Sequence, residues 1–358
     1  MSAMSVPLPD GCGVCGKEDN TRLCTGCRVM PYGSVEHQSF HRPEHKSDCN
    51  RIKKCSDAMK LQEKILRLNP LNDLDVFEES RGRFWEIWAT RPYMDARLNY
   101  RAALTFIRNA TSVKLQLPTL METMNLYPAD SGVQTREIIP AVMIRLDKDQ
   151  ECYDFLKWWA THGNVYGERS YHDSEPFLNI KDANPLEPVE PFLRNMEELP
   201  HIVCLTLIKI RLYMIMATKI GAEMNDLPKP PIFDGMSVLN KSSITTNPSI
   251  ASLEGLALAK AAETVMCQIQ TLYDAVNDYN PLIWPELLDP DETVGNAPMG
   301  KGLSQREQAN AVQLWTWLAW AETYGATSFL RELFNKHDAS FCQQCHSLFH
   351  AQCCCLEH

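Results

Sequence analysis

The chain has 358 residues, of which 44% are hydrophobic and 22% are charged. This balance is typical of an ordinary globular protein and excludes collagen-like and mostly disordered classes. The length allows one large domain, or a medium domain with a small appendage. The formal net charge of −10 predicts an acidic surface that repels phosphate backbones, so we expect no nucleic acid partner.

Fourteen cysteines stand in the chain, which makes both disulfides and metal sites conceivable. The first residues, MSAMSVPLPDG, lack the charged and apolar segments of a secretory signal peptide. We therefore expect a location in the cytoplasm, the nucleus or both. In those compartments clustered cysteines are more often metal ligands than crosslinks.

Two cysteine pairs near the amino terminus predict zinc binding. Cys12 and Cys15 form one C-x2-C pair, and Cys24 and Cys27 form a second. Each tight pair directs two thiolates at one tetrahedral ion, which then needs two more ligands from elsewhere in the chain. A segment this short also needs a bound metal ion for stability, because it cannot build an adequate hydrophobic core.

The segment that follows supplies further ligands at steps of four residues, the spacing that places side chains on one helical face. They are His37, His41, His45 and Cys49. Pro43 interrupts this face. Because proline removes a helical hydrogen bond, we expect two short turns here and not one continuous helix.

Together these residues resemble a MYND-type zinc finger, a cross-braced module that binds two zinc ions. The four stretches of the family pattern read CGVC, CTGC, YGSVEHQ and HRPEHKSDC in this chain. The resemblance implies that the second and fourth stretches share one ion. Its complete Cys3His set is then Cys24, Cys27, His45 and Cys49.

The resemblance also implies a second zinc site, which takes Cys12 and Cys15 together with positions 33 and 37. His37 is an acceptable replacement for cysteine, but Gly33 supplies no side-chain ligand. His41 is one candidate for the missing ligand, and water or a weakly held ion is the alternative. We therefore expect two Zn2+ ions, with the site of Cys12, Cys15 and His37 short of one protein ligand.

The family binds proline-rich peptides through a shallow groove beside its last helix, where a glutamine and a tryptophan contribute. Gln38 stands at the glutamine position, but Arg42 stands where the tryptophan would be. This replacement removes the main apolar contact for a short proline motif. The resemblance thus implies a protein partner bound near Gln38, with less reason to expect the usual proline-rich ligand.

Beyond Cys49 the apolar residues recur at helical spacing nearly to the end of the chain, and no run alternates as a β-hairpin would. We predict helices near residues 52–66, 93–107, 113–124, 138–146, 152–160, 201–220, 250–279 and from 304 onward. Ser304 and Glu307 form a capping box that opens the last of them. The predicted fold class is mainly α, with a small N-terminal cross-braced zinc module followed by an α-helical, solenoid-like body.

Five parts are predicted along the chain. They are the MYND-type finger (1–50), a first helical half (51–165), an acidic, proline-containing loop (166–192), a second helical half (193–338) and a Cys/His-rich tail (339–358). The helical region resembles the one that follows the finger in a set of fungal proteins of unknown function, and its paired helices resemble a tetratricopeptide-like stack. This resemblance implies an architecture and adds no activity.

The apolar stretch 201–220 approaches the length of a membrane span. Lys209 and Arg211 lie in its middle, where two charges are costly in a bilayer, so we expect a buried core helix and no membrane partner. In the tail, Cys342, Cys345, His350 and Cys355 have the spacing of a zinc knuckle. A third zinc ion, a loose tail and acylation of the cysteine run remain the alternatives there.

The function that these features favour is a zinc-binding adaptor or scaffold for protein partners, with a regulatory role open. We expect no enzyme, because no catalytic constellation can be assembled from the sequence. Two alternatives remain: an enzyme, either methyltransferase-associated or of an unrecognised kind, and an adaptor for a ubiquitin ligase. A methyltransferase of the SET class would carry an Asn-His-x-Cys motif and a Gly-Glu-Glu stretch, and the chain has neither.

Overall fold

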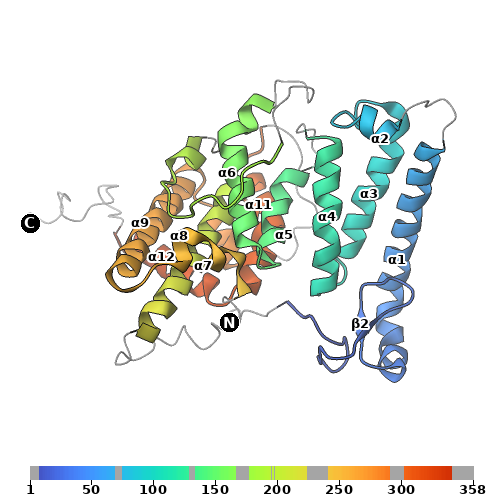
Figure 1. Ribbon diagram of the computed structural model, residues 1–358, viewed down its shortest axis with the longest axis horizontal. Helices are drawn as coiled ribbons and strands as arrows, with labels where there is room; N and C mark the ends of the chain where they lie inside the picture. The colour runs from blue at the N-terminus through green and yellow to red at the C-terminus, as the bar shows by residue number, and fades with distance from the viewer. Residues whose placement is uncertain are drawn as a thin grey trace, which may run out of the picture. The chain divides into compact units, whose positions relative to one another are not determined.

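The computed structural model describes residues 8–68, 75–128, 134–166, 177–194, 196, 198–223, 241–290 and 302–340. Helices dominate these residues, whose β-structure is limited to one antiparallel pair of two-residue strands (Figure 1). The predicted fold class, mainly α with a small N-terminal zinc-binding module, is confirmed. The zinc-knuckle residues Cys342, Cys345, His350 and Cys355 lie outside the described residues.

The amino-terminal part of the chain contains β1 (Arg22–Leu23), β2 (Pro31–Tyr32), α1 (Val35–Arg67), α2 (Val76–Glu79), η1 (Trp88–Thr90), α3 (Arg91–Leu104), α4 (Ala110–Leu126) and α5 (Thr135–Ile144). The remainder contains α6 (Asp149–Tyr166), η2 (Glu190–Arg194), α7 (Leu199–Glu223), η5 (Ser243–Thr246), α8 (Pro248–Ala251), α9 (Gly255–Tyr279), α10 (Ile283–Leu288), α11 (Gln305–Glu322) and α12 (Ala326–Ser340).

The chain divides into two units. The amino-terminal unit comprises Pro7–Leu146 and His162–Phe177, and the carboxyl-terminal unit comprises Asp147–Thr161 and Leu178–His358 with Met1–Val6. Most of α6 therefore lies in the carboxyl-terminal unit, although the sequence places it in the first helical half. The reason is its contacts: Gln150 Oε1 accepts a hydrogen bond from Asn247 Nδ2 at 2.9 Å, and the Tyr153 ring lies beneath Lys209 Nζ at 5.4 Å.

Helix α1 is continuous through Pro43, so the prediction of two short turns is wrong. Ser34 caps its first turn by accepting a hydrogen bond from His37 N at 3.2 Å. Pro43 leaves one carbonyl of the first turns without its helical donor, which costs about 3 kcal/mol. The helix persists because the face that carries His45, Cys49 and Ile52 is buried, and this packing outweighs one lost hydrogen bond.

The finger and the helices of the amino-terminal unit share one hydrophobic core. Figure 1 shows α1, α3 and α4 side by side, in agreement with their contacts. Val29 and Tyr32 from the finger pack in the same cluster as Ile52 of α1 and Leu104 of α3, and all four are buried. The predicted boundary at residue 50 falls inside α1, so the finger is continuous with the helices that follow.

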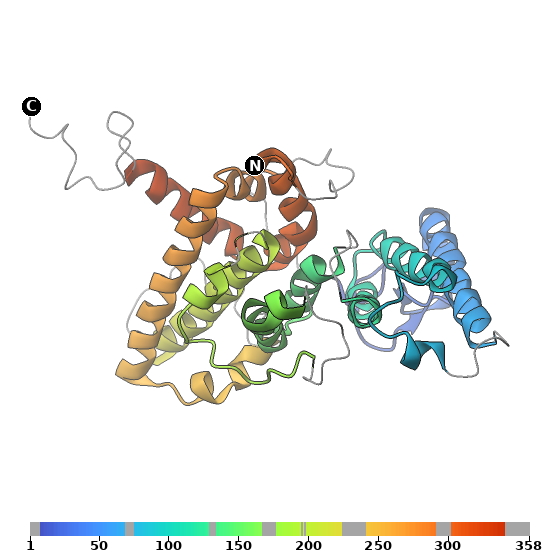
Figure 2. The same ribbon diagram turned by 90° about the horizontal axis from the view of Figure 1, so that it is seen from above.

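In the carboxyl-terminal unit, α7 is the central helix and α9 packs along it (Figures 1 and 2). Residues 199–221 are long and apolar enough to cross a membrane, but 89% of the most apolar window is buried inside the protein. Arg211 Nε donates to Asp149 Oδ2 at 2.8 Å, and Lys209 Nζ donates to Gln268 Oε1 at 2.6 Å. Arg211 is thus paired with a carboxylate and the Lys209 amine is hydrogen-bonded to an amide oxygen, as burial of such groups in a core helix requires.

Two helices of this unit differ from the predicted ranges. α9 begins at Gly255, since Pro248–Ala251 forms a separate short helix that Asn247 caps by accepting from Ser249 N at 2.9 Å. α10 lies between residues 279 and 304, where no helix is predicted. The capping box of α11 is confirmed, because Glu307 N donates to Ser304 Oγ and Ser304 N donates to Glu307 Oε2.

Candidate metal centre

The first two ligand pairs sit in tight turns closed by backbone hydrogen bonds. In the first turn Gly16 N donates to Cys12 O at 2.8 Å, and Gly16 adopts a left-handed φ of 71°, which glycine tolerates without strain. In the second turn Arg28 N donates to Cys24 O at 2.9 Å. The pairing of β1 with β2 connects this second turn to the start of α1.

The first group of ligands is complete and buried. It consists of Cys24, Cys27, His45 and Cys49, whose ligand atoms all lie within 4.8 Å of one another. Cys24 Sγ is 3.7 Å from Cys49 Sγ, and Cys27 Sγ is 3.4 Å from His45 Nε2. Tetrahedral zinc bonds of about 2.3 Å to sulfur and about 2.0 Å to nitrogen place such atoms about 3.5–3.8 Å apart. The group therefore fits one zinc ion with almost no rearrangement.

The electrostatics of this group also favour a divalent cation. Burial, together with the nearby thiols of Cys24 and Cys49, raises the pKa of the Cys27 thiol to about 12. Burial lowers the pKa of His45, and the charges of His41 and Arg42 lower it too, so the imidazole keeps a free lone pair. Several thiolates at this distance repel one another unless a cation lies between them. Binding of a divalent cation therefore stabilises this arrangement of donors.

Gln38 and Arg42, which the family resemblance connects with a peptide groove, lie near the start of α1. Gln38 is half-buried, and its Nε2 donates to Cys24 Sγ at 3.6 Å. Arg42 is exposed. The amide of Gln38 therefore supports a ligand sulfur of the complete site.

The second group contains three of the predicted ligands, Cys12, Cys15 and His37. Cys12 is buried and its Sγ lies 3.3 Å from His37 Nδ1, whereas Cys15 is exposed. A Cβ atom at Gly33 would lie 3.7 Å from His37 Nδ1 and 3.9 Å from Cys12 Sγ. Position 33 therefore borders the group, as the family pattern requires, but glycine supplies no donor there.

His41, the candidate for the missing ligand, is not part of this group. Its Nδ1 lies 3.0 Å from the Tyr32 hydroxyl, and its Nε2 lies 3.7 Å from Glu44 Oε2. The ring also stacks on His45, with a centroid distance of 5.7 Å and an interplanar angle of 18°. His41 thus borders the complete site, and the second group has three protein ligands among the described residues.

The Cys12 thiol has the electrostatic surroundings of a metal ligand. Burial opposes its ionisation, but the backbone N–H groups of Cys15, Gly33 and Val14 contact the sulfur, and together they lower its pKa to about 6. Backbone N–H groups aimed at a sulfur stabilise the thiolate, which is the form that binds zinc. The two groups are thus consistent with two zinc sites, one with four protein ligands and one with three.

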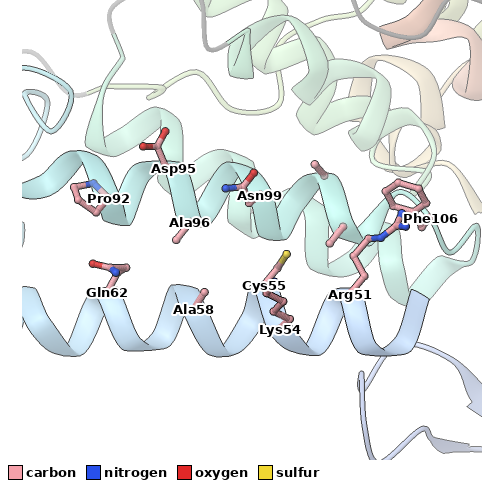
Figure 3. Close-up of a pocket in the computed structure, with 12 residues that line it drawn as sticks. Arg51, Lys54, Cys55, Ala58, Gln62, Pro92, Asp95, Ala96, Asn99 and Phe106 are labelled. Carbon is pink, nitrogen blue, oxygen red and sulfur yellow. The ribbon is translucent and has the colours of Figure 1, made fainter. Parts of the chain in front are cut away.

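A groove of about 590 Å³ lies between α1 and α3, outside the two ligand groups (Figure 3). Small side chains line much of it: Ala58 of α1 and Ala96, Ala102 and Ala103 of α3. At one end Arg51 lies over the Phe106 ring, 3.6 Å from its centroid, and Lys54 lies nearby. At the other end Figure 3 shows Gln62 opposite Pro92.

The sequence carries a signal for this groove that is separate from the spacing of the metal ligands. Arg51, Lys54 and Ala58 follow one another at steps of three and four residues, and Leu61, Ile65 and Leu68 continue the same series. Such spacing keeps side chains on one helix face. The last three are 55%, 52% and 66% exposed, so α1 has a second apolar stripe beside the one that packs in the core.

Comparison with known proteins identifies the amino-terminal segment. The family model described as MYND finger matches residues 12–49, which contain both groups of ligands. A Rho GTPase-activating protein, gacZ of Dictyostelium discoideum, is 35% identical over 66 residues, which are 18% of this chain and 6% of that protein. No solved structure matches the chain. Residues 12–49 are thus a MYND zinc finger, and the matched region is a small part of the relative.

Proposed function

We propose that the protein is a zinc-stabilised adaptor that binds one amphipathic helix of a protein partner in the groove between α1 and α3. The role needs no catalytic chemistry, and we place it in the cytoplasm or the nucleus, without a nucleic acid or membrane partner. The observation that carries the proposal is the groove itself: an apolar centre, a cationic end and an adjacent exposed apolar stripe.

The dimensions of the groove suit a helix. Its α3 side runs from Pro92 to Phe106, which corresponds to about 21 Å, or about four helical turns, at 1.5 Å per residue. Alanines at the centre allow a partner backbone to come close, whereas Leu or Phe would hold it away. Beyond the groove, Leu61 and Ile65 offer apolar surface to the same partner helix.

The charges favour a partner with acidic residues. Residues 51–68 contain six Lys or Arg and two Asp or Glu, although the whole chain has a net charge of −10. Arg51 and Lys54 stand at one end of the groove, and Asp95 stands closer to the other. A carboxylate near the Arg51 end of the partner helix is therefore attracted, and the asymmetry fixes the direction in which that helix lies.

The finger contributes by positioning α1. Three of its ligands, His37, His45 and Cys49, lie on the first half of this helix, and Arg51 follows two residues after the last. The buried cysteine ligands, which are all but Cys15, share a hydrophobic cluster with Ala103 and Leu104 of α3. Zinc binding thus holds both walls of the groove, and the resemblance of the helical body to tetratricopeptide-like regions of fungal proteins accords with this scaffold role.

The experiment is a quantitative pull-down with the full chain and two matched charge reversals on α1. Lys54→Glu changes a groove residue, and Lys60→Glu changes an exposed lysine on the same helix that does not line the groove. We expect the same partner to be retained by wild type and Lys60→Glu and lost at least tenfold with Lys54→Glu. Equal recovery with both variants would contradict the proposed surface.

A further inference from the structure

We propose that the site of Cys12, Cys15 and His37 keeps one coordination position for a ligand from outside the chain, and that this position takes a thiolate. The inference concerns the chain's own residues around the ion and does not depend on the proposed adaptor role. Three observations carry it: the place of Gly33, the engagement of His41, and the solvent exposure of one side of the group.

Gly33 marks where the fourth donor belongs. A Cβ at this position would stand 3.7 Å from His37 Nδ1 and 3.9 Å from Cys12 Sγ, both ordinary van der Waals distances. Apart from Gly33 and its two chain neighbours, no other atom of the described residues lies within 4 Å of that point. A thiol carried on such a Cβ would reach the centre of the group, so the space for a fourth ligand exists and only the donor is missing.

The nearest spare imidazole does not fill this position. His41 Nδ1 lies 3.0 Å from the Tyr32 hydroxyl, its ring face is stacked on His45, and its Nε2 lies 3.7 Å from Glu44 Oε2. Moving it into the second group would break its contacts with Tyr32 and His45. The described residues therefore offer three ligands, while tetrahedral zinc takes four.

The position faces solvent. Gly33 and Cys15 are exposed and His37 is half-buried, in contrast to the complete site, whose four ligands are all buried. Among the described residues, none therefore has to be displaced for an external molecule to approach from the Gly33 side. This is the arrangement of zinc sites that exchange a ligand, in which three protein donors leave one position open.

The donor set favours a thiolate as that ligand. Two thiolates and one neutral imidazole give no excess negative charge around Zn2+, whereas the neighbouring site has three thiolates. Zinc accepts soft sulfur ligands readily, and one external thiolate would give this site the same Cys3His composition. On binding, the thiol loses its proton to solvent and the sulfur lone pair forms the bond to the metal, with no change of oxidation state.

The test uses the full chain with Co2+ in place of zinc and glutathione as the probe thiol, because thiolate coordination to Co2+ changes its visible and near-ultraviolet absorption. We expect two ions per chain in wild type and a saturable change at one of them when glutathione is added. The same response should persist in Gly33→Ala, whose Cβ fits at ordinary van der Waals distances and adds no donor.

Gly33→Cys is the matched variant that fills the fourth coordination position, because it supplies the missing thiolate from the chain. We expect its spectrum without glutathione to resemble that of glutathione-saturated wild type, with no further response to the thiol, and its second ion to resist a chelator at least tenfold better. An equal glutathione response in Gly33→Cys would overturn the proposal, as would a single bound ion or an unresponsive spectrum in wild type.

Native mass spectrometry of the zinc-loaded protein keeps the test decisive if Gly33→Cys does not fold. We expect one glutathione adduct on the two-zinc form of wild type, lost in His37→Ala together with one ion, and retained in Lys60→Glu. An adduct that survives in His37→Ala would place the thiol elsewhere and refute the assignment. None of these readouts involves a protein partner, so failure here is distinct from failure of the adaptor role.

Discussion

Asn109 links the cap of α4 to the finger, because one side chain serves both. Its Oδ1 accepts from Ser112 N at 2.7 Å, and its Nδ2 donates to Val29 O at 3.1 Å, across eighty residues of sequence. Asn109 is buried, so neither hydrogen bond can be replaced by water at the surface. These two hydrogen bonds thereby fix the position of the start of α4 relative to the second ligand turn.

The first prediction concerns this link. Asn109→Ala removes an N-cap, which costs about 1 kcal/mol, and leaves the buried Val29 carbonyl without its donor, which costs about 1–3 kcal/mol more. We expect urea unfolding of the zinc-loaded protein to show a loss of about 2–4 kcal/mol. Asn99→Ala, at an exposed site on α3, is the control and should stay within about 0.5 kcal/mol of wild type.

The second prediction concerns Pro43 inside α1. Pro43 is exposed, and alanine at this position restores a backbone N–H to the helix without disturbing the buried face. We expect Pro43→Ala to raise the thermal unfolding temperature of the amino-terminal unit, with a gain of up to about 3 kcal/mol. Ser47→Ala, one turn further along the same exposed side, should have a much smaller effect. A destabilised Pro43→Ala would show that the proline itself is required for the ligand geometry.

The third prediction concerns pH and Lys209. Burial lowers the pKa of this lysine from 10.5 to about 7. Between these values the unfolded chain binds the proton and the folded chain does not, so the free energy of unfolding rises with pH across this window. Lys209→Met removes the titrating group. Urea unfolding should therefore show a larger increase in the free energy of unfolding between about pH 7 and about pH 9.5 for wild type than for Lys209→Met. Equal increases would mean that Lys209 is charged in the folded protein.

The fourth prediction concerns removal of the complete zinc site. Cys24→Ser takes one ligand from a Cys3His group that is buried, so no external ligand can take its place and the remaining three donors do not hold the ion. Because metal binding is coupled to folding of such modules, we expect loss of one ion, faster proteolysis within residues 12–49, and faster hydrogen exchange in α1 near Cys49. Helix α7, in the other unit, should keep its exchange protection, and equal loosening there would contradict separate units.

The ligand set was predictable because its signals are local. The spacing of Cys12, Cys15, Cys24 and Cys27 specifies two knuckles, and the capping box of Ser304 with Glu307 lies within four residues. Helical periodicity likewise located most helices, since each depends on its own apolar face. These features need no knowledge of what the segment packs against.

The features that escaped prediction depend on tertiary contacts. Helix α1 continues through Pro43 because Cys49 and Ile52 are buried in the hydrophobic core of the unit. Sequence spacing alone does not reveal this burial. His41 lies beside Tyr32 and stacks on His45. These contacts depend on the tertiary structure. The groove depends on which face of α3 meets α1, so Ala58 and Ala96 have meaning only once the two helices are paired.

The most direct test of the adaptor role is photo-crosslinking from the groove. A photoreactive amino acid at Ala58 faces the groove, and the same group at Lys60 provides the matched control on α1. We predict that Ala58 captures a partner whose linked peptide is an amphipathic helix with acidic residues near one end, and that Lys54→Glu abolishes the capture. A linked peptide that is extended or basic, or equal capture from Lys60, would contradict the account.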